Sequence, residues 1–225
     1  MYMNKRKYYE AYDERYKTAH EKSIRWFGDE PSAVVLEIIE KYKIDKKDSI
    51  LELGCGEGRD AQVLLNNGYQ LLATDISKEA IEFCEKLSEQ YKNNYQVLDC
   101  VNGKLDEKFD FIYAVAVIHM LVLDEDRKAF YQFIYNHLTE NGISLICTMG
   151  DGELERQSNL NTAFELQERE CDGVTLWVAG TSCRMVNDAT FEKELTENGF
   201  EILERGQASI PQVFPQMMYA VVKKK

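Results

Sequence analysis

Residues 50–60, with the sequence ILELGCGEGRD, carry the clearest chemical signal in the chain. After a short apolar run, three glycines alternate with other residues: Gly54, Gly56 and Gly58. Glycine adopts backbone angles that other residues avoid, and it has no side chain to hold a ligand away from the backbone. The apolar run predicts a strand and the residues after the turn predict a helix, and such a turn faces the ligand crevice of an open α/β sheet. We therefore expect a flat or polar ligand to contact this turn closely.

The charges around the turn help to choose between two classes of cofactor. Dinucleotide-binding proteins place G-x-G-x-x-G at such a turn, with a pyrophosphate at the start of the helix. Here the spacing is G-C-G-E-G, Glu57 lies inside the turn, and Glu52 precedes the first glycine by two residues. This negative charge favours a cationic or neutral ligand over a diphosphate. Asp75, at the end of the next predicted strand, is placed to hold both hydroxyls of a ribose, a feature of both classes. A nicotinamide cofactor is therefore the less favoured alternative.

Short apolar runs alternate with helical patterns from residue 49 onward. The apolar runs predict seven strands, over 49–53, 69–74, 95–98, 109–116, 143–149, 200–204 and 218–222. The patterns between them predict helices over 59–67, 77–90, 124–138 and 190–198. This alternation predicts an α/β fold in which helices cover both faces of a mostly parallel sheet. No linker or internal repeat interrupts it, so we expect one domain over residues 1–225.

Two segments fall outside this alternation, residues 1–45 and residues 150–187. In the first, four side chains spaced four apart share one side of a predicted helix: Tyr8, Tyr12, Tyr16 and His20. This stripe predicts either packing on the sheet or a lid over a ligand. A second helix is expected over 33–42. The second segment carries four glycines and no strong repeat, and we interpret it as an insertion with a short hairpin around 174–178 that lines the substrate site.

Composition and charge exclude several classes of function. The chain has 27 basic and 39 acidic side chains and a formal net charge of −12, which disfavours nucleic acid as a partner. No apolar run is long enough to span a bilayer, and the N-terminal residues lack the apolar segment of a signal peptide. Six cysteines and three histidines are scattered without the spacing of a metal site. We expect a cytoplasmic protein with reduced thiols, no metal and no membrane contact.

Four motifs in order resemble those of class I S-adenosylmethionine-dependent methyltransferases: ILELGCGEG, LLATDIS, YQVLDC and FDFIYAVAVIHML. The resemblance is close over residues 49–149 and looser over 188–222. It implies a Rossmann-like, seven-stranded, mostly parallel sheet with an antiparallel last strand and an N-terminal helical cap. It also implies S-adenosylmethionine as the methyl donor and S-adenosylhomocysteine as the product. The chain lacks the Asn/Asp-Pro-Pro-Tyr/Phe motif and the Pro-Cys pair of nucleic-acid methyltransferases, so a small-molecule acceptor is expected.

The resemblance implies a cofactor role for ten residues: Glu52, Gly54, Cys55, Gly56, Asp75, Ile76, Asp99, Cys100, Val115 and Ala116. Residues 54–56 would line the floor under the methionine part and the ribose, and Glu52 would face the methionine ammonium. Asp75 would hold the ribose hydroxyls, and Asp99 would accept a hydrogen bond from the adenine amine. Backbone groups at 115–116 would face the methionine end beside the reactive methyl.

The residues that act on the acceptor are less specifically indicated. His119, near the end of the fourth predicted strand, is a candidate general base, and the alternative is a histidine packed at the start of a helix. Five residues are candidates for the lid or the substrate contacts: Tyr16, His20, Trp26, Trp177 and Arg184. Aromatic faces among them would favour a sulfonium through cation–π attraction. A protein that binds the cofactor without catalysis is a further alternative, because a complete binding site does not establish turnover.

Overall fold

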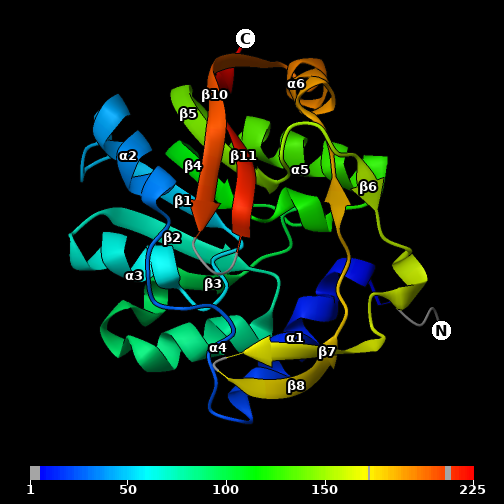
Figure 1. The fold of residues 1–225 in the computed structure, drawn as a ribbon. Helices are drawn as coiled ribbons and strands as arrows, with labels where there is room; N and C mark the ends of the chain where they lie inside the picture. Colours follow the sequence, from blue (N-terminus) through cyan, green and yellow to red (C-terminus); the bar gives the residue numbers. More distant parts are fainter. Residues whose placement is uncertain (1–5, 172, 211–213) are drawn as a thin grey trace, which may run out of the picture.

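The computed structural model describes residues 6–171, 173–210 and 214–225, and a seven-stranded sheet forms the centre of this part of the chain (Figure 1). Its strands are β1 (Ser49–Leu53), β2 (Gln70–Asp75), β3 (Tyr95–Val97), β4 (Phe109–Val115), β5 (Leu138–Met149), β10 (Phe200–Ile210) and β11 (Phe214–Lys224). They lie in the order β10-β11-β5-β4-β1-β2-β3. Strands β1 to β5 pair in parallel, and β11 is antiparallel to both of its neighbours. The predicted sheet is confirmed.

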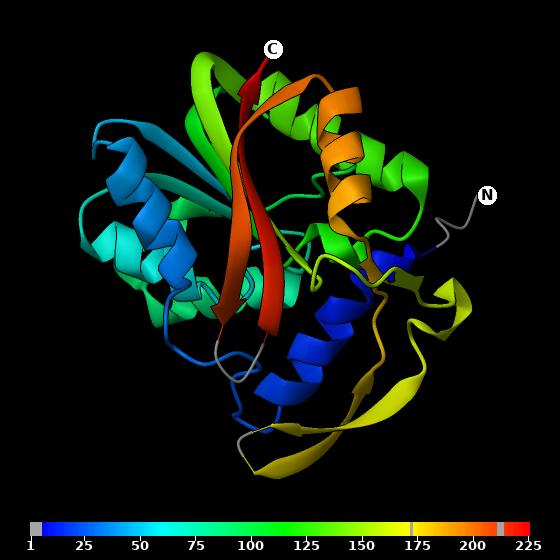
Figure 2. The same cartoon turned by 45° about the horizontal axis from the view of Figure 1, so that its top comes forward.

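Helices cover both faces of the sheet (Figures 1 and 2). One face packs against α2 (Ala33–Tyr42), α3 (Arg59–Asn66) and α4 (Lys78–Leu87), and the other against α5 (Asp124–His137) and α6 (Asp188–Glu197). Because helices cover both faces, the central strands are apolar along most of their length. The carboxyl ends of β1, β2 and β4 meet at one edge, which is where open α/β sheets bind ligands.

The last two strands are longer than the apolar runs predicted. β10 continues to Ile210 and β11 begins at Phe214, whereas the sequence pattern indicated 200–204 and 218–222. Along β10, side chains alternate between more buried and more exposed positions, so polar residues interrupt every apolar run. The antiparallel pairing of the two strands forms a long ribbon that no single apolar run could indicate.

The N-terminal segment and the insertion pack against each other at the ligand edge of the sheet (Figure 2). A 3₁₀ turn (Tyr8–Glu10) leads into α1 (Ala11–His20), and the insertion contains β6 (Arg156–Gln157), β7 (Leu166–Cys171), β8 (Val174–Ala179) and β9 (Arg184–Met185). The insertion does contain a hairpin, the antiparallel pair β7–β8, but the predicted residues 174–178 form only its second strand. The buried Arg15 guanidinium joins α1 to this hairpin by donating to the carbonyl oxygens of Ala179 and Gly180, each at 3.0 Å.

Two further features concern membrane-spanning helices and groups of metal-binding side chains. Within residues 6–171, 173–210 and 214–225, no helix combines the length and the apolar character needed to cross a membrane. The same residues contain no group of three or more histidine, cysteine or acidic side chains placed to hold a metal ion. Cys55, Cys84, Cys100, Cys147 and Cys183 are free thiols.

Candidate active site

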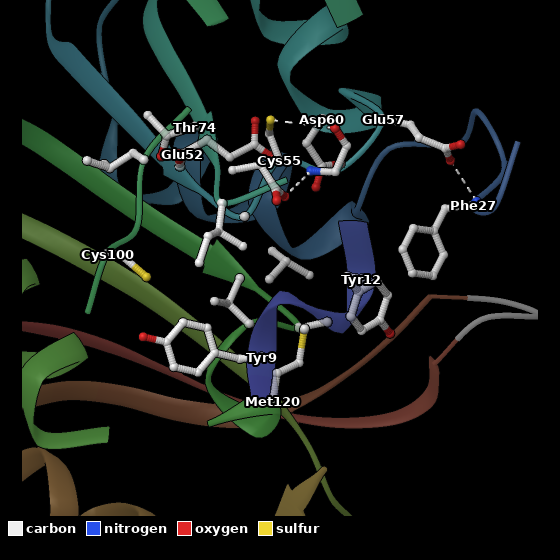
Figure 3. Close-up of a pocket in the computed structure, with 18 of the residues that line it drawn as sticks. Tyr9, Tyr12, Phe27, Glu52, Cys55, Glu57, Asp60, Thr74, Cys100 and Met120 are labelled. Atoms are coloured by element: carbon white, nitrogen blue, oxygen red, sulfur yellow. Dashed lines mark hydrogen bonds between the residues drawn. The ribbon is translucent and has the colours of Figure 1, made fainter. Parts of the chain in front are cut away.

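One cavity lies at the carboxyl ends of β1, β2 and β4, between the glycine turn and the N-terminal segment (Figure 3). The ten residues with a predicted cofactor role all line it: Glu52, Gly54, Cys55, Gly56, Asp75, Ile76, Asp99, Cys100, Val115 and Ala116. In Figure 3, Glu52, Cys55 and Thr74 stand on one side of this space, and Tyr9, Tyr12 and Met120 stand on the other. The sequence motifs are thus brought together, although they span more than sixty residues of the chain.

The glycine turn has the backbone geometry that its sequence predicts. Gly54 and Gly56 have φ values of +73° and +54°, in the left-handed region that disfavours other residues. A Cβ atom on Gly54 would collide with Val117 Cγ2, and one on Gly56 would lie 2.7 Å from the hydroxyl of Tyr16. Both positions require glycine, because the surrounding side chains come close to the backbone of the turn.

Two buried carboxyl groups lie beside the turn. Asp75 accepts hydrogen bonds from the backbone N–H of Gly56 and of Ser77, both at 2.8 Å, and burial raises the pKa of Asp75 to about 6. Glu52 is 4% exposed, and its Oε2 atom has no hydrogen-bond partner among the described residues. Burial raises the pKa of Glu52 well above its ordinary value. A buried carboxyl oxygen without a partner is costly, so a donor supplied by a ligand would stabilise it.

The other end of the cavity is formed by Asp99 and its neighbours. The Asp99 carboxylate accepts from the Lys7 ammonium at 2.6 Å and from the Val101 N–H at 2.9 Å. Although burial acts in the opposite direction, these donors lower the pKa of Asp99. Ile76 and Cys100 line the cavity beside it, and burial raises the pKa of the Cys100 thiol to about 12. This end therefore offers one ionised acceptor within a mainly apolar wall.

Aromatic side chains of the N-terminal segment cover the cavity. We call residues 8–27 the lid. Four of its side chains line the cavity: Tyr9, Tyr12, Tyr16 and Phe27. The rings of Tyr12, Tyr16 and Phe27 lie within 6.5 Å of one another, centroid to centroid. Of the two interpretations of the tyrosine stripe, the geometry supports a lid, although Tyr8 lies outside the lining and donates instead to Asp126.

Sequence reasoning missed several lining residues. Tyr9 and Phe27 line the cavity, whereas the candidates from the sequence were their neighbours Tyr8 and Trp26. The backbone turns at the two ends of α1 decide which residue of each pair faces the cavity. An apolar wall opposite the turn was also missed: Val117, Met120, Leu121 and Phe214. The first three follow the predicted Ala116, whose left-handed φ of +59° turns the chain at the end of β4.

Four of the five lid and substrate candidates lie outside the lining, and Tyr16 alone lines the cavity. His20 lies between two carboxylates, and the Trp26 ring packs against the guanidinium of Arg15 at 4.7 Å. Trp177 is 60% exposed on β8, and Arg184 donates to the carbonyl oxygen of Val122. The cavity lining does not include Trp177 or Arg184, which corrects the expectation that these two contact the substrate there, whereas His20 and Trp26 lie in the lid for which they were candidates.

The candidate base His119 is also outside the cavity lining. It lies on a 3₁₀ turn (Ile118–Met120), is 3% exposed, and its ring packs edge-on to Phe214 with 5.7 Å between centroids. Burial, with the nearby Arg127 charge, lowers the pKa of His119 to about 3. The ring is therefore neutral at ordinary pH and packs as a core side chain, which corrects its placement beside the acceptor.

The depressed pKa of His119 makes stability depend on pH. In the unfolded chain His119 takes up a proton near pH 6.5, whereas in the folded chain it does so only near pH 3. Stability from this residue is therefore lost as the pH falls below 6.5. The His119→Gln variant has no such titrating group. We therefore expect the unfolding free energy of the variant, minus that of the unchanged chain, to rise by about 2 kcal/mol as the pH falls from 7 to 5. Urea unfolding at both values measures this, and a pH-independent difference would contradict it.

Comparisons with known proteins agree with the geometry. A family model described as a methyltransferase domain matches residues 51–144. The chain is 26% identical over 117 residues to a protein of Haemophilus influenzae named probable S-adenosyl-L-methionine-dependent methyltransferase TehB, covering 51% of this chain and 41% of that one. It is 30% identical over 118 residues to the ubiquinone biosynthesis O-methyltransferase of Rickettsia typhi, covering 50% and 47%. The chain spans less than half the length of these two relatives.

Solved structures match most of the chain at low identity. An S-adenosylmethionine-dependent methyltransferase from Clostridium acetobutylicum has a TM-score of 0.65 and 16% identity, covering 95% of this chain and 97% of that one. The 1,6-didemethyltoxoflavin-N1-methyltransferase of Burkholderia thailandensis has a TM-score of 0.69 and 14% identity, covering 93% and 84%. These likenesses show a shared fold.

Proposed function

We propose that this chain, which carries a class I S-adenosylmethionine-dependent methyltransferase domain, transfers a methyl group from S-adenosylmethionine to a small-molecule acceptor. The observation that carries the proposal is the convergence of the glycine turn, Asp75 and Asp99 on one covered cavity. Three loops that follow three parallel strands supply these groups, which is the arrangement expected for a nucleoside site in this fold.

The residues of the cavity fit this cofactor. The unpartnered Glu52 oxygen is an acceptor for the ammonium group of a methionine. Gly54 and Gly56 leave the backbone of the turn without side chains, and a ligand would reach that backbone where Val117 and Tyr16 now lie. The fit extends along the cavity, with acidic acceptors at both ends and apolar walls between them.

The chemistry divides between cofactor and protein. S-adenosylmethionine supplies a methyl group that is already electrophilic, because it is bonded to a sulfonium. The protein then has to bind, orient and exclude water. Asp75 would accept both ribose hydroxyls, and Asp99 would accept the adenine amine beside Ile76. The aromatic side chains of the lid would keep water from the reacting atoms.

The walls of the cavity support a small acceptor with an apolar body. The lid covers one side, and the wall opposite the turn is apolar: Val117, Met120, Leu121 and Phe214. The described lining contains no histidine or lysine, so a general base for the acceptor would have to be one of its carboxylates, tyrosines or cysteines. The acidic chain also repels polyanions, which supports a small molecule over nucleic acid.

Calorimetric titration with S-adenosylmethionine, S-adenosylhomocysteine and NAD tests the proposal. We expect micromolar binding of the first two and no binding of NAD. Binding of NAD alone would contradict the proposal and favour an oxidoreductase with a variant dinucleotide turn. A screen of thiol, amine, hydroxyl and metalloid acceptors for S-adenosylhomocysteine formation then separates an enzyme from a binding protein, because only an enzyme forms product.

A further inference from the structure

Glu57, the acidic residue inside the glycine turn, has its hydrogen-bond partners in the lid. Its carboxylate is buried and accepts from His20 Nε2 at 2.9 Å, from the Trp26 N–H at 2.9 Å and from the Phe27 N–H at 2.8 Å. Figure 3 shows Glu57 directed at the chain beside Phe27. Both carboxylate oxygens are used, and all three donors belong to the lid. The turn that lines the cavity therefore also anchors the cover of the cavity.

His20 is held between two carboxylates. Its Nε2 faces Glu57 of the turn, and its Nδ1 lies 2.9 Å from Glu79 Oε1 in the first turn of α4. Its ring stacks on Phe83 at 4.4 Å. A neutral imidazole has one N–H and can donate to only one of the two acids, whereas the imidazolium donates to both. The geometry therefore matches the protonated ring.

The other groups packed around His20 do not reverse the preference for the protonated ring. Arg25 is the nearby cation, and its Nη2 donates to the Glu57 carbonyl oxygen at 3.3 Å. Tyr16 stacks on the ring from within α1, with 6.0 Å between centroids. Although burial acts against the charged form, the hydrogen bonds to Glu57 and Glu79 raise the pKa of His20. Lid closure is therefore stabilised at low pH and lost as the pH rises from 6.5 through the raised pKa.

We propose that Glu57 is a positioning residue that docks the lid on the cofactor turn through protonated His20, so that lid closure and cofactor retention depend on the same side chain. This inference rests on the proposed function of the cavity. The cavity lies between the turn and the lid, and the Tyr16 hydroxyl lies against Gly56, so a ligand of the turn reaches it only when the lid moves away. Breaking the contact at Glu57 would open the lid while the sheet stays intact.

The chain contains its own reporter of lid position. It has two tryptophans, Trp26 in the lid and the exposed Trp177 on β8, so Trp177→Phe leaves Trp26 as the only indole. In this parent chain, without added cofactor, we expect acrylamide quenching of Trp26 to be low at pH 6 and to rise severalfold by pH 9. His20→Gln in the same background should give high quenching at every pH. Quenching that is independent of pH in the parent would overturn the proposal.

A second readout connects docking to the cofactor. Glu57→Gln should raise Trp26 quenching at pH 6 and should release S-adenosylhomocysteine about tenfold faster, and its association should be no slower than in the parent. The matched control is Glu79→Gln, which removes the other partner of His20 outside the cavity. It should shift the pH midpoint of quenching downward while retaining slow release at pH 6. Parent-like quenching and release in Glu57→Gln would overturn the proposal.

The two readouts separate this inference from the function on which it rests. If the parent binds no S-adenosylhomocysteine but its quenching follows pH as described, docking stands and the proposed function fails. If the parent binds S-adenosylhomocysteine but its Trp26 quenching does not change with pH, the proposed function stands and the docking proposal fails. Circular dichroism checks the fold of each variant, and if Glu57→Gln does not fold, the pH profile and His20→Gln decide the question.

Discussion

Replacement of Asp75 by alanine is expected to weaken the binding of S-adenosylhomocysteine at least a hundredfold. If Asp75 holds the ribose as proposed, the variant loses two charge-assisted hydrogen bonds of about 1.5–3 kcal/mol each, and about 1.4 kcal/mol is a factor of ten in affinity. It also leaves the N–H groups of Gly56 and Ser77 without their acceptor, which loosens the turn. Calorimetry measures the loss, and affinity equal to that of the unchanged chain would remove the ribose role of Asp75.

The same residue predicts how binding depends on pH. Burial raises the pKa of Asp75 to about 6, so the carboxylate that we propose accepts the two ribose hydroxyls is present above pH 6 and is lost below it. We expect affinity to fall by up to about tenfold for each pH unit below 6. Asp75→Asn, which keeps the shape and cannot ionise, should bind weakly with no such slope. A slope that persists in the asparagine variant would assign it to another group.

Replacement of Gly54 by alanine is expected to abolish detectable cofactor binding and to destabilise the fold by about 2–4 kcal/mol. The left-handed φ of +73° costs about 1 kcal/mol for a residue with a Cβ, and the collision with Val117 adds about 1–3 kcal/mol of overpacking. Thermal unfolding and calorimetric titration measure the two effects. Unchanged stability would show that the turn can move away from Val117 without cost.

Two further variants separate the causes of this effect. Adding Val117→Ala to Gly54→Ala removes the collision and keeps the backbone strain, so it should recover most of the lost stability. Gly68 is the matched control, because its φ is +82° and a Cβ there would meet no atom within 4 Å. Gly68→Ala should cost about 1 kcal/mol from strain alone and should leave cofactor binding unchanged.

The sheet and the ten residues that line the cavity could be predicted because their signals are local. Each apolar run is followed within a few residues by its glycine or acidic side chain, and parallel strands bring those ends to one edge. Glu57 shows the limit of such reasoning. Its charge within the turn argued against a diphosphate, whereas its partners lie about thirty residues earlier in the lid. Neither its own sequence context nor a helical period indicates that contact.

The placement of His119 and the bounds of the last two strands were wrong for related reasons. The position of His119 just after β4 suggested the site, but a 3₁₀ turn directs its ring to Phe214, a residue from the far end of the chain. The length of β10 depends on its pairing with β11 rather than on its own apolar residues. In both cases a contact between distant segments decides the outcome.

The attachment of α1 to the insertion has a consequence for engineering this chain. Arg15 joins two segments that are more than 160 residues apart, and its guanidinium also packs against Trp26 of the lid. A chimaera that takes residues 150–187 from a relative would therefore place a foreign hairpin against a helix selected for another one. The two segments should be exchanged as a pair, and a new acceptor preference built on this scaffold should be designed on both together.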